Sequence, residues 1–261
     1  MLRENNGKML DEILKRLEDI AYLQGYKFVF EKSDSCEMEY DSFKLMPTDK
    51  TLRKAENICR ILPEDLSGKR VLDIGCNKGF FSFECLRRGA NKVVGIDVLP
   101  EIIGVLQQIV PCSRLFKGLK FYKMQFGREL ASFGKFDLIL FLSCYHYVYG
   151  DLKSHNKIFS ILSSLCVERV ILELPLELDD NFARKFLKTK CQGESLAGYN
   201  YHTILHAASR YFGSVRYMAN SGFLRTRDIF ILEKPAACGS EYLCEWKDKD
   251  NVWGRFNLWA K

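Results

Sequence analysis

The residues between Val71 and Asp97 have the types and the spacing that bind a nucleotide. An acid, Asp73, precedes a turn flanked by Gly75 and Gly79, and a second acid, Asp97, ends the next apolar run. Gly75 permits a tight turn, and Gly79 lets the backbone approach a ligand because it has no Cβ. Asp97 follows at the distance from which a carboxylate accepts hydrogen bonds from a ribose diol. We therefore expect a nucleotide-binding βαβ unit made of a strand, a turn, a helix and an acid-ended strand.

The glycine spacing distinguishes between cofactors. A dinucleotide fold requires G-x-G-x-x-G, whose second glycine admits a pyrophosphate at a helix N-terminus. This chain has D-x-G-x-x-x-G, with Asn77 in the middle position. The carboxylate of Asp73 would repel a pyrophosphate but suits a cationic ligand. The alternative is an ordinary parallel-sheet turn with an incidental acid.

The same stretch resembles motif I of the class I S-adenosylmethionine (SAM) methyltransferases. The resemblance implies SAM as the cofactor, with Asp73 near its methionine amino group and Asp97 holding its ribose. It also implies an α/β fold, a Rossmann-like seven-stranded sheet with helices on both faces and a terminal antiparallel hairpin. The residues expected to bind the cofactor are Asp73, Gly75, Cys76, Asn77, Gly79, Phe80, Asp97, Val98, Gln125, Phe126 and Ser143, of which Gln125 and Phe126 border the adenine.

A second informative run, F-D-L-I-L-F-L-S-C-Y-H-Y, ends at Tyr147. A buried strand ends at Ser143, and the polar aromatic residues that follow it should lie near the substrate. The run resembles the fourth-strand motif of a subset of these methyltransferases, and Glu173 matches the end of their fifth strand. This subset includes the methyltransferase domain of bacterial O-antigen chain-terminating enzymes and the wobble-uridine tRNA enzymes, which both act on oxygen.

Methyl transfer from SAM is an in-line displacement that depends on positioning, because the sulfonium already activates the methyl group. An alcohol oxygen also loses a proton, and a histidine near neutral pKa can accept it. We therefore expect His146 to be the base or the substrate-orienting residue, with Tyr145 and Glu173 as further catalytic residues. The alternative for His146 is a hydrogen-bonded structural histidine. Glu173 could equally orient a ring nitrogen.

The methyl acceptor is open at this point. An oxygen of a saccharide or phosphorylated glycan is the first hypothesis, RNA (tRNA) is an alternative, and a non-catalytic SAM-fold partner subunit is another. The basic run Arg184, Lys185, Lys188 and Lys190 is either a solvated helix face or a surface that holds a phosphorylated glycan or RNA. No metal site is expected, because the i, i+4 pair His202 and His206 lacks the acid of an H-E-x-x-H motif.

Alternating strands and helices must position these residues. Strands are expected at 70–75, 92–98, 119–125, 136–142, 169–174, 214–219 and 228–233, and the last two should form an antiparallel hairpin. Helices are expected at 8–23, 50–62, 80–88, 100–110 and 152–165. Because ligands bind at the carboxyl ends of parallel strands, Asp73, Asp97, Gln125 and Ser143 should line one rim.

The composition is that of an ordinary globular protein, with 47% hydrophobic and 28% charged residues among 261. Its net charge of +6 permits polyanion binding without requiring it. No signal segment or membrane span is evident and the ten cysteines are scattered, so we expect a cytoplasmic protein with reduced thiols.

We expect an N-terminal helical cap (1–49), a methyltransferase domain (50–235) with a helical substrate-side insertion (179–212), and an aromatic tail (236–261). The three tryptophans of the tail fit packing onto this chain, self-association or a protein partner.

Overall fold

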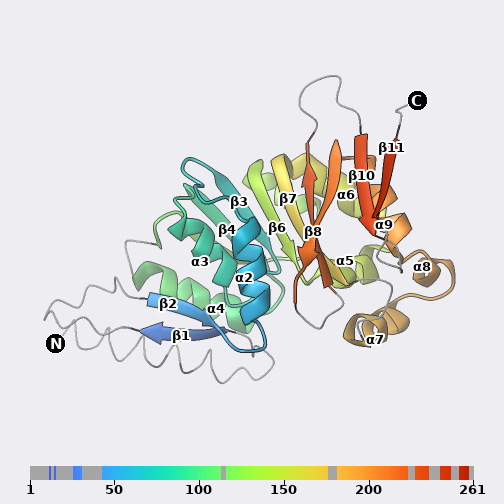
Figure 1. Cartoon of the computed structure of the whole chain (residues 1–261). Coiled ribbons are helices and arrows are strands. Elements are labelled where there is room, and N and C mark those ends of the chain that lie inside the picture. Colours follow the sequence, from blue (N-terminus) through green and yellow to red (C-terminus); the bar gives the residue numbers. More distant parts are fainter. Residues whose placement is uncertain are drawn as a thin grey trace, which may run out of the picture. The chain divides into compact units, whose positions relative to one another are not determined.

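Figure 1 shows the computed structural model, which describes residues 12, 15, 26–30, 43–112, 116–175, 181–222, 227–234, 242–247 and 253–258. The chain divides into two compact units. Unit 1 comprises Met1–Glu56 and Leu62–Gln125, and unit 2 comprises Asn57–Ile61 and Phe126–Lys261. The helix expected at 8–23 lies outside the described residues except at Glu12 and Lys15.

Unit 1 holds the expected βαβ unit. Its elements in chain order are β1 (Tyr26–Phe30), β2 (Phe43–Pro47), α2 (Leu52–Ile61, whose last residues belong to unit 2), β3 (Arg70–Ile74), α3 (Phe80–Arg87), β4 (Lys92–Asp97), α4 (Pro100–Ile109), η2 (Val110–Cys112) and β5 (Leu119–Lys123). Strand β4 pairs in parallel with β3 on one side and β5 on the other. Every residue of β3 and β4 except the first is buried, as expected of parallel strands covered on both faces. The antiparallel pair of β1 and β2 was not predicted from the sequence.

Unit 2 holds a mixed sheet of six strands in the order β11-β10-β8-β9-β7-β6. Its elements are η4 (Arg128–Phe133), β6 (Phe136–Leu142), α5 (Tyr145–Leu152), α6 (His155–Leu165), β7 (Cys166–Pro175), α7 (Asn181–Lys190), α8 (Glu194–Ala197), α9 (Tyr201–Ser209), β8 (Ser214–Asn220), β9 (Arg227–Glu233), β10 (Tyr242–Lys247) and β11 (Trp253–Leu258). Strands β6 and β7 are parallel, whereas β9 is antiparallel to both β7 and β8.

The predicted α/β fold is confirmed, because β3 to β9 supply the seven strands and β8 and β9 form the antiparallel hairpin. Two features differ from the prediction. The helix expected at 152–165 begins three residues later as α6, and α5 was not predicted before it; the left-handed φ of 51° at Lys153 ends α5 and separates the two helices. The Ser154 hydroxyl then accepts a hydrogen bond from the amide of Lys157 and begins α6. The tail also adds strands, since β10 pairs in parallel with β8 of the same chain.

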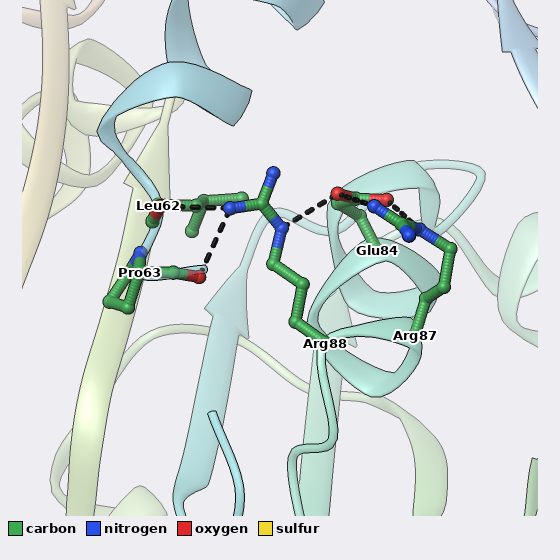
Figure 2. A network of polar contacts seen from close by, with 5 residues as sticks. All are labelled: Leu62, Pro63, Glu84, Arg87 and Arg88. Atoms are coloured by element: carbon green, nitrogen blue, oxygen red, sulfur yellow. Dashed lines mark hydrogen bonds and ion pairs between the residues drawn. The ribbon is translucent and has the colours of Figure 1, made fainter. Parts of the chain in front are cut away.

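An arginine clamp joins the end of α3 to the segment after α2 (Figure 2). The Arg88 guanidinium donates hydrogen bonds to the carbonyl oxygens of Leu62 and Pro63 at 2.8 and 3.0 Å and to Glu84 at 2.7 Å. The side chain of Arg88 is 11% exposed, whereas that of Arg87, which also binds Glu84, is 71% exposed. Burial alone would raise the pKa of Glu84, but the two arginines outweigh it and lower that pKa. The clamp therefore satisfies two backbone carbonyls with a buried charge.

Candidate functional site

The turn after β3 is fixed onto the end of β4. The amides of Gly75 and Cys76 both donate to the carbonyl oxygen of Ile96, at 2.9 and 3.0 Å. Gly75 has a left-handed φ of 71°, and Asn77 has a φ of 49°. Asparagine tolerates this region better than most residues, and here its side-chain oxygen accepts a 2.7 Å bond from the amide of Lys78. The sequence D-x-G-x-N therefore builds a rigid turn against the acid-ended strand.

Asp97 is held by two backbone amides. Its Oδ2 accepts a 2.9 Å hydrogen bond from the amide of Asn77, and its Oδ1 accepts a 3.1 Å bond from the amide of Leu99. A carboxylate oxygen has two lone pairs, so each oxygen can accept one further bond. The amides thus orient the carboxylate while leaving it able to bind a vicinal diol. This arrangement of hydrogen-bond acceptors fits the ribose of SAM.

Asp73 lies beneath the turn and is only 2% exposed. Burial raises the pKa of its carboxyl group to about 6, and Asp97 adds to this effect. A 2.6 Å hydrogen bond from the Ser82 hydroxyl and the ammonium of Lys54 act in the opposite direction. A cationic ligand group would relieve the cost of this buried charge. The buried Asp73 carboxylate therefore fits the ammonium of SAM.

Gly79 has a structural reason for lacking a side chain, beside the expected one. A Cβ at this position would lie 2.9 Å from Cζ of Phe121 and 3.2 Å from Cε2 of Phe83. The space beside Gly79 is thus filled by aromatic rings of the same unit. Its φ of 81° gives a second reason for glycine. The glycine is explained by packing and by backbone conformation, and no approach of a ligand is needed to account for it.

The remaining expected cofactor residues differ in exposure. Val98 and Gln125 are exposed, Asn77 and Phe80 are half-buried, and Cys76 is buried. The ring of Phe126 is 9% exposed and stacks on Phe141 with centroids 5.5 Å apart. Phe126 belongs to unit 2, whereas the other residues of this group belong to unit 1. Their roles around the cofactor stay predictions.

In unit 2, a serine and a glutamate meet at the carboxyl ends of β6 and β7. The Ser143 hydroxyl donates a 2.5 Å hydrogen bond to Oε2 of Glu173, and the Ser143 amide donates to the Glu173 carbonyl at 3.3 Å. Glu173 is fully buried, whereas Ser143 is half-buried. Ser143 has a φ of 61°, which is uncommon for a residue other than glycine. Strain of this kind concentrates at functional sites.

Tyr145 and His146 are both fully buried in the first turn of α5, although the sequence suggested a substrate-facing cluster. The Tyr145 hydroxyl lies 2.6 Å from Nδ1 of His155, whose Nε2 lies 3.0 Å from the carbonyl oxygen of Gly198. A carbonyl only accepts, so Nε2 carries the proton and Nδ1 accepts from Tyr145. Burial raises the pKa of Tyr145 and lowers that of His155. This pair holds α5 and α6 together, and no sequence motif pointed to its histidine.

His146 lies among aromatic rings. Its ring centroid is 4.1 Å from that of Tyr147 and 6.2 Å from that of Phe186 in α7. Helix α7 approaches α5 closely, since a Cβ at Gly150 would lie 2.6 Å from Cε1 of Phe186. The structure therefore gives His146 a packing environment, and its catalytic role stays a prediction.

Helix α7 carries four basic side chains. Arg184, Lys185, Lys188 and Lys190 are all exposed. The Lys190 ammonium lies 3.6 Å from the Asp151 carboxylate of α5. On α9, the Nε2 atom of His206 accepts a 3.2 Å hydrogen bond from Arg210, and its ring centroid lies 6.1 Å from that of His202.

Among the described residues, no helix has the length and apolar character that crossing a membrane requires.

Comparison with known proteins gives the family. The family model described as "Methyltransferase domain" matches residues 65–208. A Methanocaldococcus jannaschii protein named for protein N5-glutamine methyltransferase activity is 27% identical over 60% of this chain and 81% of its own length. The O-antigen chain terminator bifunctional methyltransferase/kinase WbdD of Escherichia coli is 32% identical over 47% of this chain and 17% of its own length. A crystal structure of monomeric WbdD has a TM-score of 0.50 at 21% identity and covers 73% of this chain and 41% of that one, a likeness in fold.

Proposed function

This chain belongs to the methyltransferase-domain family and uses SAM, and we propose that it methylates an oxygen of a saccharide or phosphorylated glycan. The observation that supports an oxygen acceptor is the Ser143–Glu173 pair. A half-buried hydroxyl bonded to a fully buried carboxylate can orient an acceptor O–H group and take its proton. A similarity to WbdD over 47% of this chain supports a glycan over other acceptors.

In the proposed reaction, SAM supplies a methyl group already activated by its sulfonium. Asp97 holds the ribose and Asp73 faces the ammonium, which fixes the cofactor. The acceptor O–H donates to Ser143, whose own proton passes to Glu173. As the acceptor oxygen bonds to the methyl carbon, the carbon–sulfur bond breaks, its electrons stay on sulfur and the proton stays on Glu173. His146 is the second candidate for the proton, and Glu173 is the better supported one because it is hydrogen-bonded to the half-buried Ser143 hydroxyl.

The basic character of α7 supports an acceptor that carries negative charge. Its sequence N-F-A-R-K-F-L-K-T-K has four cations and no acid. The helix is packed onto α5, which begins two residues after Ser143, so its charges belong to the same unit as the proposed proton acceptor. Phosphate groups pair well with arginine and lysine. RNA satisfies the same charge requirement, and it is the alternative acceptor.

Transfer of labelled methyl groups from SAM into a host-cell extract tests the proposal, when the extract is separated into glycan, RNA, protein and small molecules. Label in the glycan fraction supports it, and label in a nuclease-sensitive fraction replaces it with the RNA alternative. The variant Glu173→Gln keeps the size of the side chain and removes the base. It should lower transfer by about 100-fold or more while leaving SAM binding unchanged. Unchanged transfer would remove Glu173 from the reaction.

A further inference from the structure

His155 is the first residue of α6, and both of its ring nitrogens bind other helices of unit 2. Its Nδ1 lies 2.6 Å from the Tyr145 hydroxyl in α5, and its Nε2 lies 3.0 Å from the carbonyl oxygen of Gly198 at the end of α8. The imidazole is buried and stacks on the ring of Tyr149, with the centroids 4.2 Å apart. One side chain therefore connects α5, α6 and α8.

The hydrogen bonds through His155 require a neutral imidazole. Because the Gly198 carbonyl can only accept, Nε2 is the donor and Nδ1 accepts from the Tyr145 hydroxyl. A proton on Nδ1 would make that atom a second donor, and the fully buried Tyr145 hydroxyl would lose the acceptor of its own proton. Burial also favours the neutral form and lowers the pKa of His155, although the bond to Gly198 acts in the opposite direction.

The other titratable groups around His155 are uncharged near neutral pH. Among the described residues, the titratable side chains whose rings lie against the imidazole are the phenols of Tyr145, Tyr149 and Tyr199. The Cys191 thiol, which follows α7, acts on Tyr149. The imidazole is therefore the group of this cluster whose charge changes as the pH falls below neutral.

A second hydroxyl binds α8 to α5 without passing through the imidazole. The Tyr149 hydroxyl donates a 2.6 Å hydrogen bond to the carbonyl oxygen of Ser195 in α8. A Cβ at Gly198 would lie 3.3 Å from the same hydroxyl, so α8 ends in close contact with α5. Thr203, in the first turn of α9, also donates to the Gly198 carbonyl. Helix α5 therefore holds α8 and, through Gly198, the start of α9.

These contacts lie toward the end of the sheet that holds Ser143 and Glu173. Helix α6 leads into β7 and α9 leads into β8, and both strands are antiparallel to β9, so both helices begin toward the carboxyl ends of their strands. Tyr145 follows Ser143 by two residues. We propose that His155 is a positioning residue, which in its neutral form holds α8 and the start of α9 against α5 and thereby shapes the acceptor site. The proposal rests on the proposed function of the Ser143–Glu173 pair.

Two variants that each remove one hydroxyl test this role. The probe is the glycan fraction of the host-cell extract, titrated as the methyl acceptor at saturating SAM over a pH series. Tyr145→Phe removes the donor to Nδ1 and should raise the apparent KM for the acceptor by about 3- to 10-fold above neutral pH. The wild-type KM should rise toward that of Tyr145→Phe as the pH falls and His155 takes up a proton. The ratio of the two KM values should therefore approach one in acid.

Tyr149→Phe is the matched control, because it removes a hydroxyl from the same cluster that binds a carbonyl and not the imidazole. Its KM should exceed the wild-type KM by a similar factor at every pH. Nitrogen-15 NMR of the imidazoles gives a reading that needs no acceptor. His155, identified by the loss of its signals in His155→Gln, should be the Nε2–H tautomer, and Tyr145→Phe should raise its pKa.

Two results would overturn the proposal. A KM ratio between Tyr145→Phe and wild type that stays constant with pH would mean that His155 only packs in the cluster. An Nδ1–H tautomer in the wild-type chain would contradict the direction of the hydrogen bonds. Thermal unfolding and SAM titration of each variant establish that the fold and the cofactor site are intact. Absence of methyl transfer by the wild-type chain would contradict the proposed function itself, which is a different outcome.

Discussion

The amide of Asn77 donates a 2.9 Å hydrogen bond to Oδ2 of Asp97, twenty residues further along the chain. This bond connects the glycine-flanked turn to the acid at the end of the neighbouring strand. The left-handed φ of Asn77 aims the amide at Asp97. The turn therefore shapes the backbone and also orients the carboxylate that is expected to bind the ribose.

Replacing Asp97 should weaken cofactor binding. Asp97→Ala removes a charged acceptor of two ribose hydrogen bonds and should cost about 2–4 kcal/mol of SAM binding free energy. Calorimetric titration with SAM measures the loss. Glu101→Ala, which removes an exposed acid from the first turn of α4, should have little effect. Equal affinities of wild type and Asp97→Ala would show that the ribose is bound elsewhere.

An alanine at Gly79 should destabilise the fold. Its Cβ would meet Phe121 at 2.9 Å, and the φ of 81° disfavours any side chain. We expect a loss of about 1–3 kcal/mol in the free energy of unfolding, measured with urea. Gly104→Ala is the control, because no atom lies within 4 Å of the added Cβ in α4. That helical substitution should stabilise by about 0.5–1 kcal/mol. Equal effects of the two changes would contradict the packing explanation for Gly79.

The stability contribution of Asp73 should depend on pH. Burial raises its pKa from 3.8 to about 6, so the folded state favours the protonated acid. The resulting stabilisation is full below pH 3.8 and is lost as the pH rises through about 6. Asp73→Asn keeps an acceptor for Ser82 but removes the charge that faces the Lys54 ammonium. Its stability relative to wild type should be about 1–2 kcal/mol higher at pH 8 than at pH 5, because only the wild-type acid ionises in this range. Urea unfolding at pH 5 and 8 should show this difference shrinking at the lower pH. A difference independent of pH would contradict the raised pKa.

The two arginines of Figure 2 should contribute unequally to stability. Arg88→Gln leaves the carbonyls of Leu62 and Pro63 without their charged donor, and it should cost about 1–3 kcal/mol. Arg87→Gln removes a side chain that is 71% exposed and should cost less than about 0.5 kcal/mol. Thermal or urea unfolding measures the loss of stability in each of the two variants. Similar losses would mean that the backbone carbonyls contribute nothing through Arg88.

Methyl-transfer rates measured over a pH series distinguish the two candidates for the general base, His146 and Glu173. If His146 is the base, His146→Gln should lower the rate by about 100-fold and remove the fall in activity below neutral pH. If Glu173 is the base, His146→Gln should leave the shape of the profile unchanged. A wild-type rate across the series would end the catalytic hypothesis for His146. Urea unfolding of His146→Gln distinguishes lost chemistry from lost packing, because the ring is fully buried.

The cofactor unit could be predicted from the sequence because its signals are local. The strand, turn, helix and second strand lie between Arg70 and Asp97, and the glycines and acids occur at fixed spacings within that stretch. Buried parallel strands are near-continuous apolar runs, so the bounds of β3, β4 and β6 were predicted to within one residue. The bounds of β5, an edge strand with alternating burial, were predicted to within two residues. The resemblance of this stretch to motif I of the SAM methyltransferases indicated SAM, and the family match agrees with it.

Contacts between distant residues were decided only by the tertiary structure. Tyr145 was expected near the substrate, yet it is fully buried and its hydroxyl binds His155, ten residues away and on another helix. Ser143 meets Glu173 across two strands, and Lys54 acts on Asp73 from a helix outside the motif. Local patterns report periodicity and turn chemistry, whereas burial and charge pairing arise when separate elements pack. The sequence therefore determined the fold and the cofactor, and the packed chain decided which polar residues are buried and with what partners.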